Sequence, residues 1–286
     1  MTGQLLNGRL LADKVRAQLL PPIADVVARR GRPPGLGVVL VGEDGPSVLY
    51  VRNKIRTATA LGLVSRVVRL PQDIGQDALL AAIDALNADG AIDAFLLQLP
   101  LPKHLDAQQA LARIAPHKDA DALRPVAALG RDPDALVPCT PAGCLRLIEE
   151  VQPSLTGCHA VVVGRSQIVG QPMAQLLLAR DCTVTICHRH TRDLPKHTRM
   201  ADILVVAAGV PHLIGGADIQ PGAVVIDVGI HRVEGPGGKN RLIGDVDTEA
   251  ALQVARAITP VPGGVGPMTI AMLMHNAVRA ARRTLR

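Results

Sequence analysis

Aromatic side chains are almost absent from this sequence, which has one Phe (Phe95), one Tyr (Tyr50) and no Trp in 286 residues. The core must therefore be built from Leu, Ile, Val and Ala, and nucleic-acid binding through base stacking has almost no side chains to use. A strong basic excess is missing too, because 31 Lys and Arg face 25 Asp and Glu and the charges are scattered. We therefore expect no nucleic-acid partner, whereas an anionic small molecule suits the sign of the charge.

The sequence also lacks the signals of export, of a membrane span and of disulfide or zinc frameworks. Its first residues show no basic head followed by an apolar segment, and no run reaches about 18 apolar residues. The five cysteines include no Cys-x-x-Cys pair. A reducing, cytoplasmic setting without membrane or metal is the expectation. Wholesale disorder is excluded as well, since 48% of the residues are hydrophobic and 20% are charged.

Short apolar runs alternate with amphipathic segments along the chain, which is typical of an α/β protein with largely parallel sheets. The first half is expected to contain strands at 36–42, 65–70 and 94–99 and helices at 47–61 and 76–88. The second half is expected to contain strands at 160–164, 183–187, 202–209 and 223–229 and helices at 170–180 and after Pro267. Ser47 is the predicted N-cap of the helix at 47–61, and Gly62 is its predicted stop.

The Pro- and Asp-rich stretch 124–141 is predicted to link two lobes, with a ligand cleft between them. The strands of the second lobe are near-continuous β-branched runs, which suit a parallel sheet covered on both faces. The expected fold is therefore a pair of α/β lobes.

A glycine-containing turn in the second lobe resembles a nucleotide site. A strand ends at Gly164, and a helix is predicted to start near Gly170. This geometry puts free backbone N–H groups and a helix dipole where a pyrophosphate can bind. The Gly-x5-Gly spacing is not the full Gly-x-Gly-x-x-Gly fingerprint, and many strand-to-helix turns carry glycine for steric reasons alone.

The strand that follows ends in a basic segment with Arg189 and offers no carboxylate there for a ribose hydroxyl. Arg165 lies in the preceding glycine turn, so two guanidinium groups are expected near one phosphate. Two solvated loop arginines are the alternative. In the βαβ context, we favour NADP over NAD as the cofactor.

Tyr50 and Lys54 are four residues apart on the helix at 47–61 and are expected together on the flank of its buried stripe. That stripe is predicted to consist of Val48, Val51, Ile55, Ala58 and Leu61. An ordinary surface pair is the alternative. Short-chain dehydrogenases also carry Tyr-x-x-x-Lys, but there the pair follows the nucleotide-binding turn, whereas here it precedes that turn.

Three further features are candidates for ligand binding. Gln98 comes at a strand end beside Pro100, where a simple turn residue is the alternative. Asp121 lies in a charged segment whose alternative reading is a solvated loop. The Gly- and Pro-dense segment 258–269 permits close approach of backbone to a ligand, although a structural turn uses the same residues.

Several long motifs are shared with one family nearly end to end. They include VG…SVLYVRNK (41–54), QLPLP (98–102), PCTPAG (138–143), GRSQIVGQPM (164–173), DVGI (227–230), GDVD (244–247) and PVPGGVGPMT (260–269). On these residues the chain closely resembles the bifunctional methylenetetrahydrofolate dehydrogenase/cyclohydrolase family. The family usually has Asp-Val-Asp-Gly-Phe where this chain has Asp119-Ala120-Asp121-Ala122-Leu123, so the Gly and the Phe are replaced at the pterin end of the expected pocket.

The resemblance implies a role for each candidate. Tyr50 would pack on the folate and Lys54 would be the catalytic residue. Gln98 would tune that lysine, and Asp121 would anchor the pterin. The other expected contacts are Gly164, Arg165, Ser166, Arg189 and Ile230 for NADP, and Leu99, Pro262, Gly263 and Gly264 for the substrate.

The resemblance also implies a domain division and an assembly. Residues 1–139, completed by the C-terminal helix 268–286, would form a catalytic, folate-binding domain. Residues 140–267 would form a Rossmann-like NADP-binding domain, and the enzyme would be a homodimer.

The implied reactions are NADP-dependent oxidation of 5,10-methylenetetrahydrofolate to the 5,10-methenyl form and its hydrolysis to 10-formyltetrahydrofolate. Hydride removal leaves an amidinium cation that the flanking nitrogen lone pairs stabilise, so positioning is the main demand. Hydrolysis needs proton transfer, and desolvation beside the cationic intermediate is expected to push Lys54 toward its neutral, proton-accepting form. The alternatives are a short-chain-type NADP oxidoreductase and an inactive nucleotide-sensing homologue.

Overall fold

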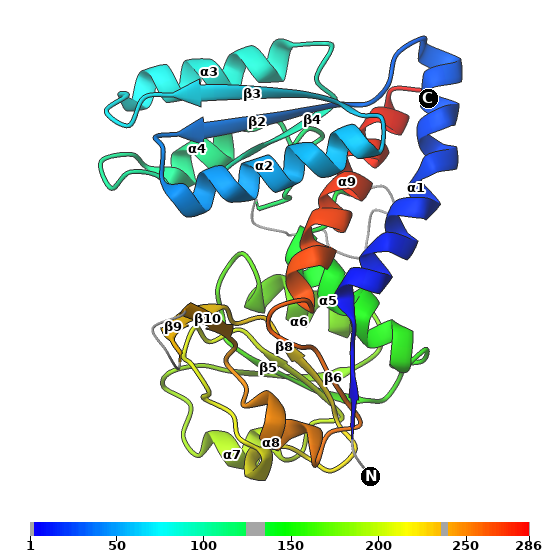
Figure 1. Ribbon diagram of the computed structural model, residues 1–286, viewed down its shortest axis with the longest axis vertical. Coiled ribbons are helices and arrows are strands. Elements are labelled where there is room, and N and C mark those ends of the chain that lie inside the picture. The colour runs from blue at the N-terminus through cyan, green and yellow to red at the C-terminus, as the bar shows by residue number, and fades with distance from the viewer. Residues whose placement is uncertain (1–2, 124–134, 236–239, 286) are drawn as a thin grey trace. The chain divides into compact units, whose positions relative to one another are not determined.

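The computed structural model describes residues 3–123, 135–235 and 240–285. They divide into two units, each with its own parallel sheet (Figure 1). The six-stranded unit contains residues 3–13 and 138–269, and the three-stranded unit contains residues 14–123, 135–137 and 270–285. The α/β prediction with largely parallel sheets is confirmed.

The six-stranded unit is a doubly covered parallel sheet with the strand order β1-β11-β8-β7-β5-β6. Its strands are β1 (Gln4–Leu5), β5 (His159–Val163), β6 (Thr183–Cys187), β7 (Ile203–Val206), β8 (Val224–Asp227) and β11 (Ala257–Ile258). Its helices are α5 (Cys139–Val151), α6 (Gly170–Leu178), α7 (Leu194–Thr198) and α8 (Thr248–Leu252), with a 3-10 turn at Gly216–Asp218. Figure 1 shows α5 and α6 on one face of this sheet and α7 and α8 on the other.

The strand order of this sheet reverses at β5, because β6 lies on one side of β5 and β7 on the other. Strands β5, β7 and β8 are buried along almost their whole length, as their apolar, β-branched sequences require in a sheet covered on both faces. In sheets of this kind, ligands bind at the carboxyl ends of the strands where the order reverses. That position in this chain is the end of β5, at Gly164.

The three-stranded unit has the strand order β3-β2-β4, all parallel. Its strands are β2 (Gly35–Val41), β3 (Val64–Leu70) and β4 (Ala94–Leu97), and its helices are α2 (Gly45–Ala60), α3 (Gln76–Ala88) and α4 (Ala107–Arg113). Two longer helices, α1 (Gly8–Arg30) and α9 (Val265–Arg283), begin in the six-stranded unit and continue into this one.

The two faces of the three-stranded sheet are buried under different helices. Val39, Phe95 and Leu97 pack with residues of α3 and α4, among them Leu79 and Ile83. Because side chains alternate along a strand, the residues between them point to the opposite face, where α2 contacts β2 and β3. The single Phe of the chain is therefore a core residue of this unit, with no exposed surface.

Two predicted helix ends are wrong. Helix α2 is capped by Asp44 rather than Ser47, because the Asp44 carboxylate accepts a hydrogen bond from the Ser47 N–H at 3.2 Å. Helix α9 begins at Val265 and so includes Pro267 in its first turn, where a missing N–H costs no helical hydrogen bond. The predicted stop at Gly62 is confirmed, since this residue has φ +82° directly after the end of α2.

The structure contains several elements that the sequence analysis did not predict. They are β1, α1, α4, α5, α7, α8, β11 and the antiparallel hairpin of β9 (His231–Glu234) and β10 (Asn240–Ile243). Within the predicted linker 124–141, residues 124–134 lie outside the described residues, and α5 already starts at Cys139. No helix in the described parts of the chain is long and apolar enough to cross a membrane.

Candidate functional site

Lys54 lies on the buried face of α2, not on its flank as predicted. The buried positions of this helix and its C-cap are Ser47, Val51, Lys54, Ala58 and Leu61, which follow one another at spacings of four and three residues. The predicted stripe members Val48 and Ile55 are only half-buried. The Lys54 side chain is 11% exposed, so its amine is largely withdrawn from bulk water.

The Lys54 amine meets two of the other predicted site residues. Its Nζ donates a hydrogen bond to Gln98 Oε1 at 3.1 Å and lies 3.6 Å from Asp121 Oδ2. The Gln98 amide cannot easily rotate, because its Nε2 donates to the carbonyl of the neighbouring Leu99 at 2.6 Å. The structure therefore brings Lys54, Gln98 and Asp121 together, and we call these three residues the lysine cluster.

Gln98 reaches this cluster because of the strand it follows. Strand β4 ends at Leu97 rather than at the predicted residue 99, but the Gln98 N–H still donates to Val39 O at 2.9 Å. Phe95 and Leu97 point toward α3 and α4, so the pleat directs Gln98 to the opposite face, which α2 covers. The register of β4 against β2 thus places the amide opposite Lys54.

Asp121 is positioned by a short segment that lies beside β4. The Phe95 N–H donates to Lys118 O at 2.8 Å, and the Ala120 N–H donates to Phe95 O at 3.0 Å. Asn276 of α9, which is 1% exposed, donates from Nδ2 to Ala120 O at 2.9 Å and to Val137 O at 2.8 Å. Sequence analysis missed Asn276, because α9 carries other polar residues, His275 among them, and nothing local sets this amide apart.

Ala122, where the resembling family has Gly, adopts a backbone conformation that favours Gly. Its φ is +52°, in the left-handed region that an L-residue enters at a cost. The Asp119 side chain supports this turn, because its Oδ1 accepts a hydrogen bond from the Ala122 N–H at 2.9 Å. This chain therefore places an Ala in a left-handed position that Gly adopts at a lower cost.

Tyr50 lies one turn before Lys54 on α2 and is 46% exposed. Its ring is therefore available to a ligand, while the neighbouring amine is already held by the protein. Pro262, Gly263 and Gly264 belong to the six-stranded unit, in the turn between β11 and α9. A contact between that turn and the folate remains a prediction.

The turn after β5 requires glycine at both predicted positions. Gly164 has φ +128°, and a Cβ there would collide with the carbonyl oxygen of Ala207. A Cβ on Gly170 would collide with the carbonyl oxygen of Gly164. The two glycines thus allow the start of α6 to lie directly against the end of β5, which is the close packing that dinucleotide sites need.

The predicted free N–H groups at the start of α6 are not free. The Ser166 hydroxyl accepts hydrogen bonds from the Val169 and Gly170 N–H groups at 3.2 and 3.3 Å, and the Gln171 N–H donates to Ser166 O at 3.0 Å. In the described chain, it is the preceding N–H groups, of residues 165–168, that form no hydrogen bond. An anion would therefore bind to the loop rather than to the helix terminus.

The two arginines predicted for the cofactor follow paired strand ends. Val163 of β5 and Cys187 of β6 are register partners, and Arg165 and Arg189 each come two residues later. Both arginines are exposed, and Arg189 donates from Nε to His190 Nε2 at 3.1 Å. The parallel register thus brings both guanidinium groups to one edge of the sheet, where phosphate oxygens match their donor geometry.

Two buried carboxylates, which sequence analysis did not single out, hold the loops at this same edge. Asp245 is fully buried, and its Oδ2 accepts hydrogen bonds from the Ala208 and Gly209 N–H groups at 2.7 and 2.9 Å. Its Oδ1 lies 2.7 Å from His231 Nε2. The loop after β7 and the start of β9 are thus joined through one carboxylate.

Asp227, at the end of β8, is the second of these carboxylates. It accepts hydrogen bonds from the N–H groups of Gly229, Asp245 and Val246, each at 2.9 Å. Burial raises the pKa of Asp227 to about 6, against the lowering effect of these N–H donors. Ile230, a predicted NADP contact, follows this loop and is 53% exposed. The motifs at 227–230 and 244–247 were the available signal, but neither aspartate had an assigned role.

A glycine turn where the strand order of a parallel sheet reverses, with two arginines beside it, is typical of a dinucleotide-binding unit. In this chain the second α/β unit carries the largely buried Lys54 amine. Family models match both parts of the chain. The "Tetrahydrofolate dehydrogenase/cyclohydrolase, catalytic domain" model matches residues 6–121, and the corresponding "NAD(P)-binding domain" model matches residues 138–285. The chain belongs to the tetrahydrofolate dehydrogenase/cyclohydrolase family.

Individual relatives agree with this assignment over almost the whole chain. The Bifunctional protein FolD of Phenylobacterium zucineum is 52% identical over 291 residues, which covers 99% of this chain and 98% of the relative. The crystal structure of the bifunctional FolD dehydrogenase/cyclohydrolase from Campylobacter jejuni is 40% identical, with a TM-score of 0.92 and coverage of 98% and 99%. The FolD structure of Trypanosoma brucei, complexed with NADP and an inhibitor, is 39% identical, with a TM-score of 0.94 and coverage of 100% and 99%.

Proposed function

We propose that this chain oxidises 5,10-methylenetetrahydrofolate with NADP and hydrolyses the resulting 5,10-methenyl compound to 10-formyltetrahydrofolate. The membership of both units in the dehydrogenase/cyclohydrolase family supports this function. The observation that carries it at the level of chemistry is the lysine cluster, in which Lys54 lies between Gln98 and Asp121. An oxidoreductase with the Tyr-x-x-x-Lys pair of short-chain enzymes would need that pair after the nucleotide turn, within the nucleotide-binding unit.

The residues at the edge of the six-stranded sheet suit NADP. The unbonded N–H groups at 165–168 suit a pyrophosphate, and Arg165 and Arg189 suit the 2′-phosphate. When bound, NADP accepts the hydride from the methylene carbon. The flanking nitrogens of the substrate stabilise the cation that remains. The protein therefore needs to orient the substrate and the cofactor in this step, and it needs no base.

The hydrolytic step asks the protein for a proton acceptor. Water adds through its oxygen to the amidinium carbon and loses a proton, which we propose that Lys54 accepts. The bond from this carbon to N5 then breaks, and N5 takes the remaining hydroxyl proton, which leaves the formyl group on N10. In the structure the amine lies 3.6 Å from Asp121 Oδ2, within ion-pair distance of this carboxylate. If the pterin binds the Asp121 carboxylate, as the anchoring role requires, Lys54 loses its ion-pair partner. The Lys54 amine would still donate its hydrogen bond to Gln98. Substrate binding would thereby prepare the amine for proton transfer.

An assay with both half-reactions tests the proposal. Purified protein is mixed with methylenetetrahydrofolate and NADP, and methenyl formation is followed spectrophotometrically; hydrolysis is followed separately from added methenyltetrahydrofolate. Turnover in both assays is the expected result. Cofactor binding without turnover in either assay would instead identify a nucleotide-sensing homologue and overturn the proposed function.

The proposal includes a cytoplasmic location and a homodimer. None of the five cysteines, all of which lie in the described residues, forms a disulfide, which agrees with a reducing compartment. Light scattering on the purified protein measures the assembly. A mass of twice the 30.0 kDa chain is expected, and a mass of one chain would contradict the dimer.

A further inference from the structure

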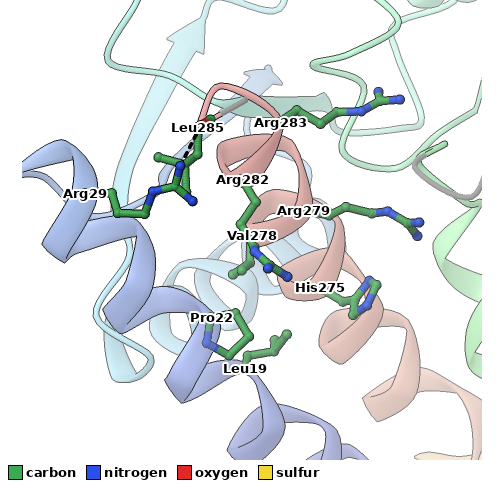
Figure 2. A pocket seen from close by; sticks show the side chains of 9 residues that line it. All are labelled: Leu19, Pro22, Arg29, His275, Val278, Arg279, Arg282, Arg283 and Leu285. Carbon is green, nitrogen blue, oxygen red and sulfur yellow. Dashed lines mark hydrogen bonds between the residues drawn. The ribbon is translucent and has the colours of Figure 1, made fainter.

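Arg29, at the cavity of about 340 Å³ between α1 and α9, is a charged residue with a structural role (Figure 2). Its Nη2 donates to Leu285 O at 2.7 Å, just beyond the end of α9. A cation at this end of a helix also offsets the partial negative charge of the last carbonyl groups. The buried carboxylate of Asp245 in the six-stranded unit has no such simple explanation, because its position carries an electrostatic cost.

The cost comes from a second carboxylate beside Asp245. Asp245 is fully buried, and its N–H donates at 2.9 Å to Oδ1 of Asp227, which is 1% exposed. Like charges at this separation repel each other, and the charge of Asp245 contributes to the raised pKa of Asp227. Gly229 must also lack a side chain, since a Cβ there would collide with Asp245 Oδ1. Unfavourable local arrangements that persist in native proteins gather at functional sites.

The Asp245 carboxylate connects two loops at the carboxyl edge of the six-stranded sheet. Its Oδ2 accepts hydrogen bonds from the Ala208 and Gly209 N–H groups, in the loop after β7, at 2.7 and 2.9 Å. Its Oδ1 lies 2.7 Å from Nε2 of His231, which directly follows Ile230 in the loop after β8. Because β7 and β8 are paired neighbours, this single side chain fixes the backbone of one loop relative to the other.

Both loops present apolar side chains at the edge where the cofactor is proposed to bind. The loop after β7 adjoins the glycine turn, because a Cβ on Gly164 would collide with the carbonyl oxygen of Ala207. Val210 in this loop is 46% exposed, and Ile230 in the loop after β8 is 53% exposed. Exposed apolar side chains at the end of a parallel sheet suit the flat rings of a dinucleotide, whose sites are lined mostly by apolar groups.

We propose that Asp245 is a positioning residue for the dinucleotide, which fixes the loops after β7 and β8 so that Val210 and Ile230 meet the bound NADP. This inference rests on the cofactor part of the proposed function. Asp245 acts through the loops and not by touching the cofactor, since it is fully buried behind the N–H groups that it binds.

Calorimetric titration of the full-length protein with NADP tests this role, at a temperature where circular dichroism shows each variant to be folded. Asp245→Ala removes the acceptor of the loop N–H groups and should weaken NADP binding about tenfold or more. Asp245→Asn keeps the shape and one acceptor oxygen, so it should recover part of this loss and bind about threefold more weakly than the parent protein. If Asp245→Ala does not fold, Asp245→Asn decides, and an affinity equal to that of the parent overturns the proposal.

Asp202→Ala is the matched control. Asp202 directly precedes the same strand, β7, and its Oδ2 accepts a hydrogen bond from the His159 N–H at 2.8 Å, at the amino edge of the sheet. Its loss should leave NADP affinity within about twofold, because this edge lies away from the two loops.

Three results separate the possible failures. Equal losses of affinity in Asp202→Ala and Asp245→Ala would show general loosening of the unit and would overturn the positioning role. NADP binding by Asp245→Ala as tight as by the parent protein would overturn it too, while leaving the proposed function intact. Absence of NADP binding by the parent protein would overturn the proposed function, and this inference with it.

Discussion

Replacing Lys54 by Met separates the two reactions that we propose for this protein. Met fills the same position beside Val51 and Ala58 on the buried face of α2 but removes the amine from Gln98 and Asp121. General acid–base groups contribute roughly 10²–10⁴-fold, so cyclohydrolase turnover should fall by about that factor. Hydride transfer needs no protein base, so the dehydrogenase rate should fall by less than about tenfold.

The stability of this variant should change little. The Asp121 carboxylate that loses its partner is 16% exposed and regains contact with water, and the apolar Met suits its buried neighbours. A change of about 1 kcal/mol in the free energy of unfolding is expected, measured by urea denaturation. A much larger loss would mean that the two rate measurements report misfolding.

Lys54→Arg is the matched control. Arg keeps a positive charge that can pair with Asp121, but it cannot give up its proton in a protein. If the amine accepts the proton from water, this variant should lose cyclohydrolase activity as fully as Lys54→Met. Equal losses of both activities in Lys54→Met, or recovery of hydrolysis in Lys54→Arg, would refute the role of proton acceptor.

Three further predictions concern the cofactor and the stability of each unit. Arg165→Gln with Arg189→Gln should raise KM for NADP about tenfold or more and leave KM for NAD nearly unchanged, because only NADP carries the 2′-phosphate; steady-state kinetics with both cofactors measures this. Ala122→Gly should raise the free energy of unfolding by up to about 1 kcal/mol in urea denaturation, because Gly adopts φ +52° without the steric cost of Ala. Asp227→Asn should gain stability relative to the parent protein as pH rises from about 4 to about 6, by up to about 3 kcal/mol.

The sign of the last effect follows from the raised pKa of Asp227. Between pH 4 and 6 the folded protein keeps the proton that the unfolded chain has already lost, so the parent protein loses stability as pH rises through this window. Asn does not titrate, so the difference between the two proteins should grow with pH. A difference that is constant over this range would contradict a raised pKa at Asp227.

Each of the other two predictions has its own contrary outcome. Equal increases of KM for NADP and NAD would show that Arg165 and Arg189 do not recognise the 2′-phosphate. Ala120→Gly serves as the control for Ala122→Gly, because Ala120 is fully buried and has no positive φ, so that Gly should destabilise the protein there. Destabilisation by Ala122→Gly would mean that the left-handed turn costs the native protein nothing.

The parallel sheets were predictable because their strands are buried runs of β-branched residues with helical segments between them. The sheet order was not, since it depends on pairings such as that of β1 with β11, more than 250 residues apart along the chain. Helix α1 contains Pro21 and Pro22, residues that usually end a helix, so local sequence argues against it. Tertiary packing prevails over local preference there.

In the site, too, local sequence predicts part of the arrangement, and contacts between residues far apart along the chain decide the rest. A 3.6-residue pattern of apolar residues assigns Lys54 to the flank of α2, because a lysine does not count as a buried residue. Only the approach of Gln98 and Asp121 reveals that this lysine completes the buried face. Likewise, Asp227 and Asp245 are 18 residues apart, and neither is marked by local sequence as the acceptor of loop N–H groups.

The proposed mechanism depends most on where the Lys54 amine lies when a folate is bound. A crystal structure with NADP and a folate analogue measures this directly. We expect the Asp121 carboxylate on the pterin and Lys54 Nζ within about 3 Å of the one-carbon position, or of a water molecule next to it, with Gln98 still bonded to the amine. An analogue bound far from this amine, with Lys54 directed into solvent, would contradict the mechanism.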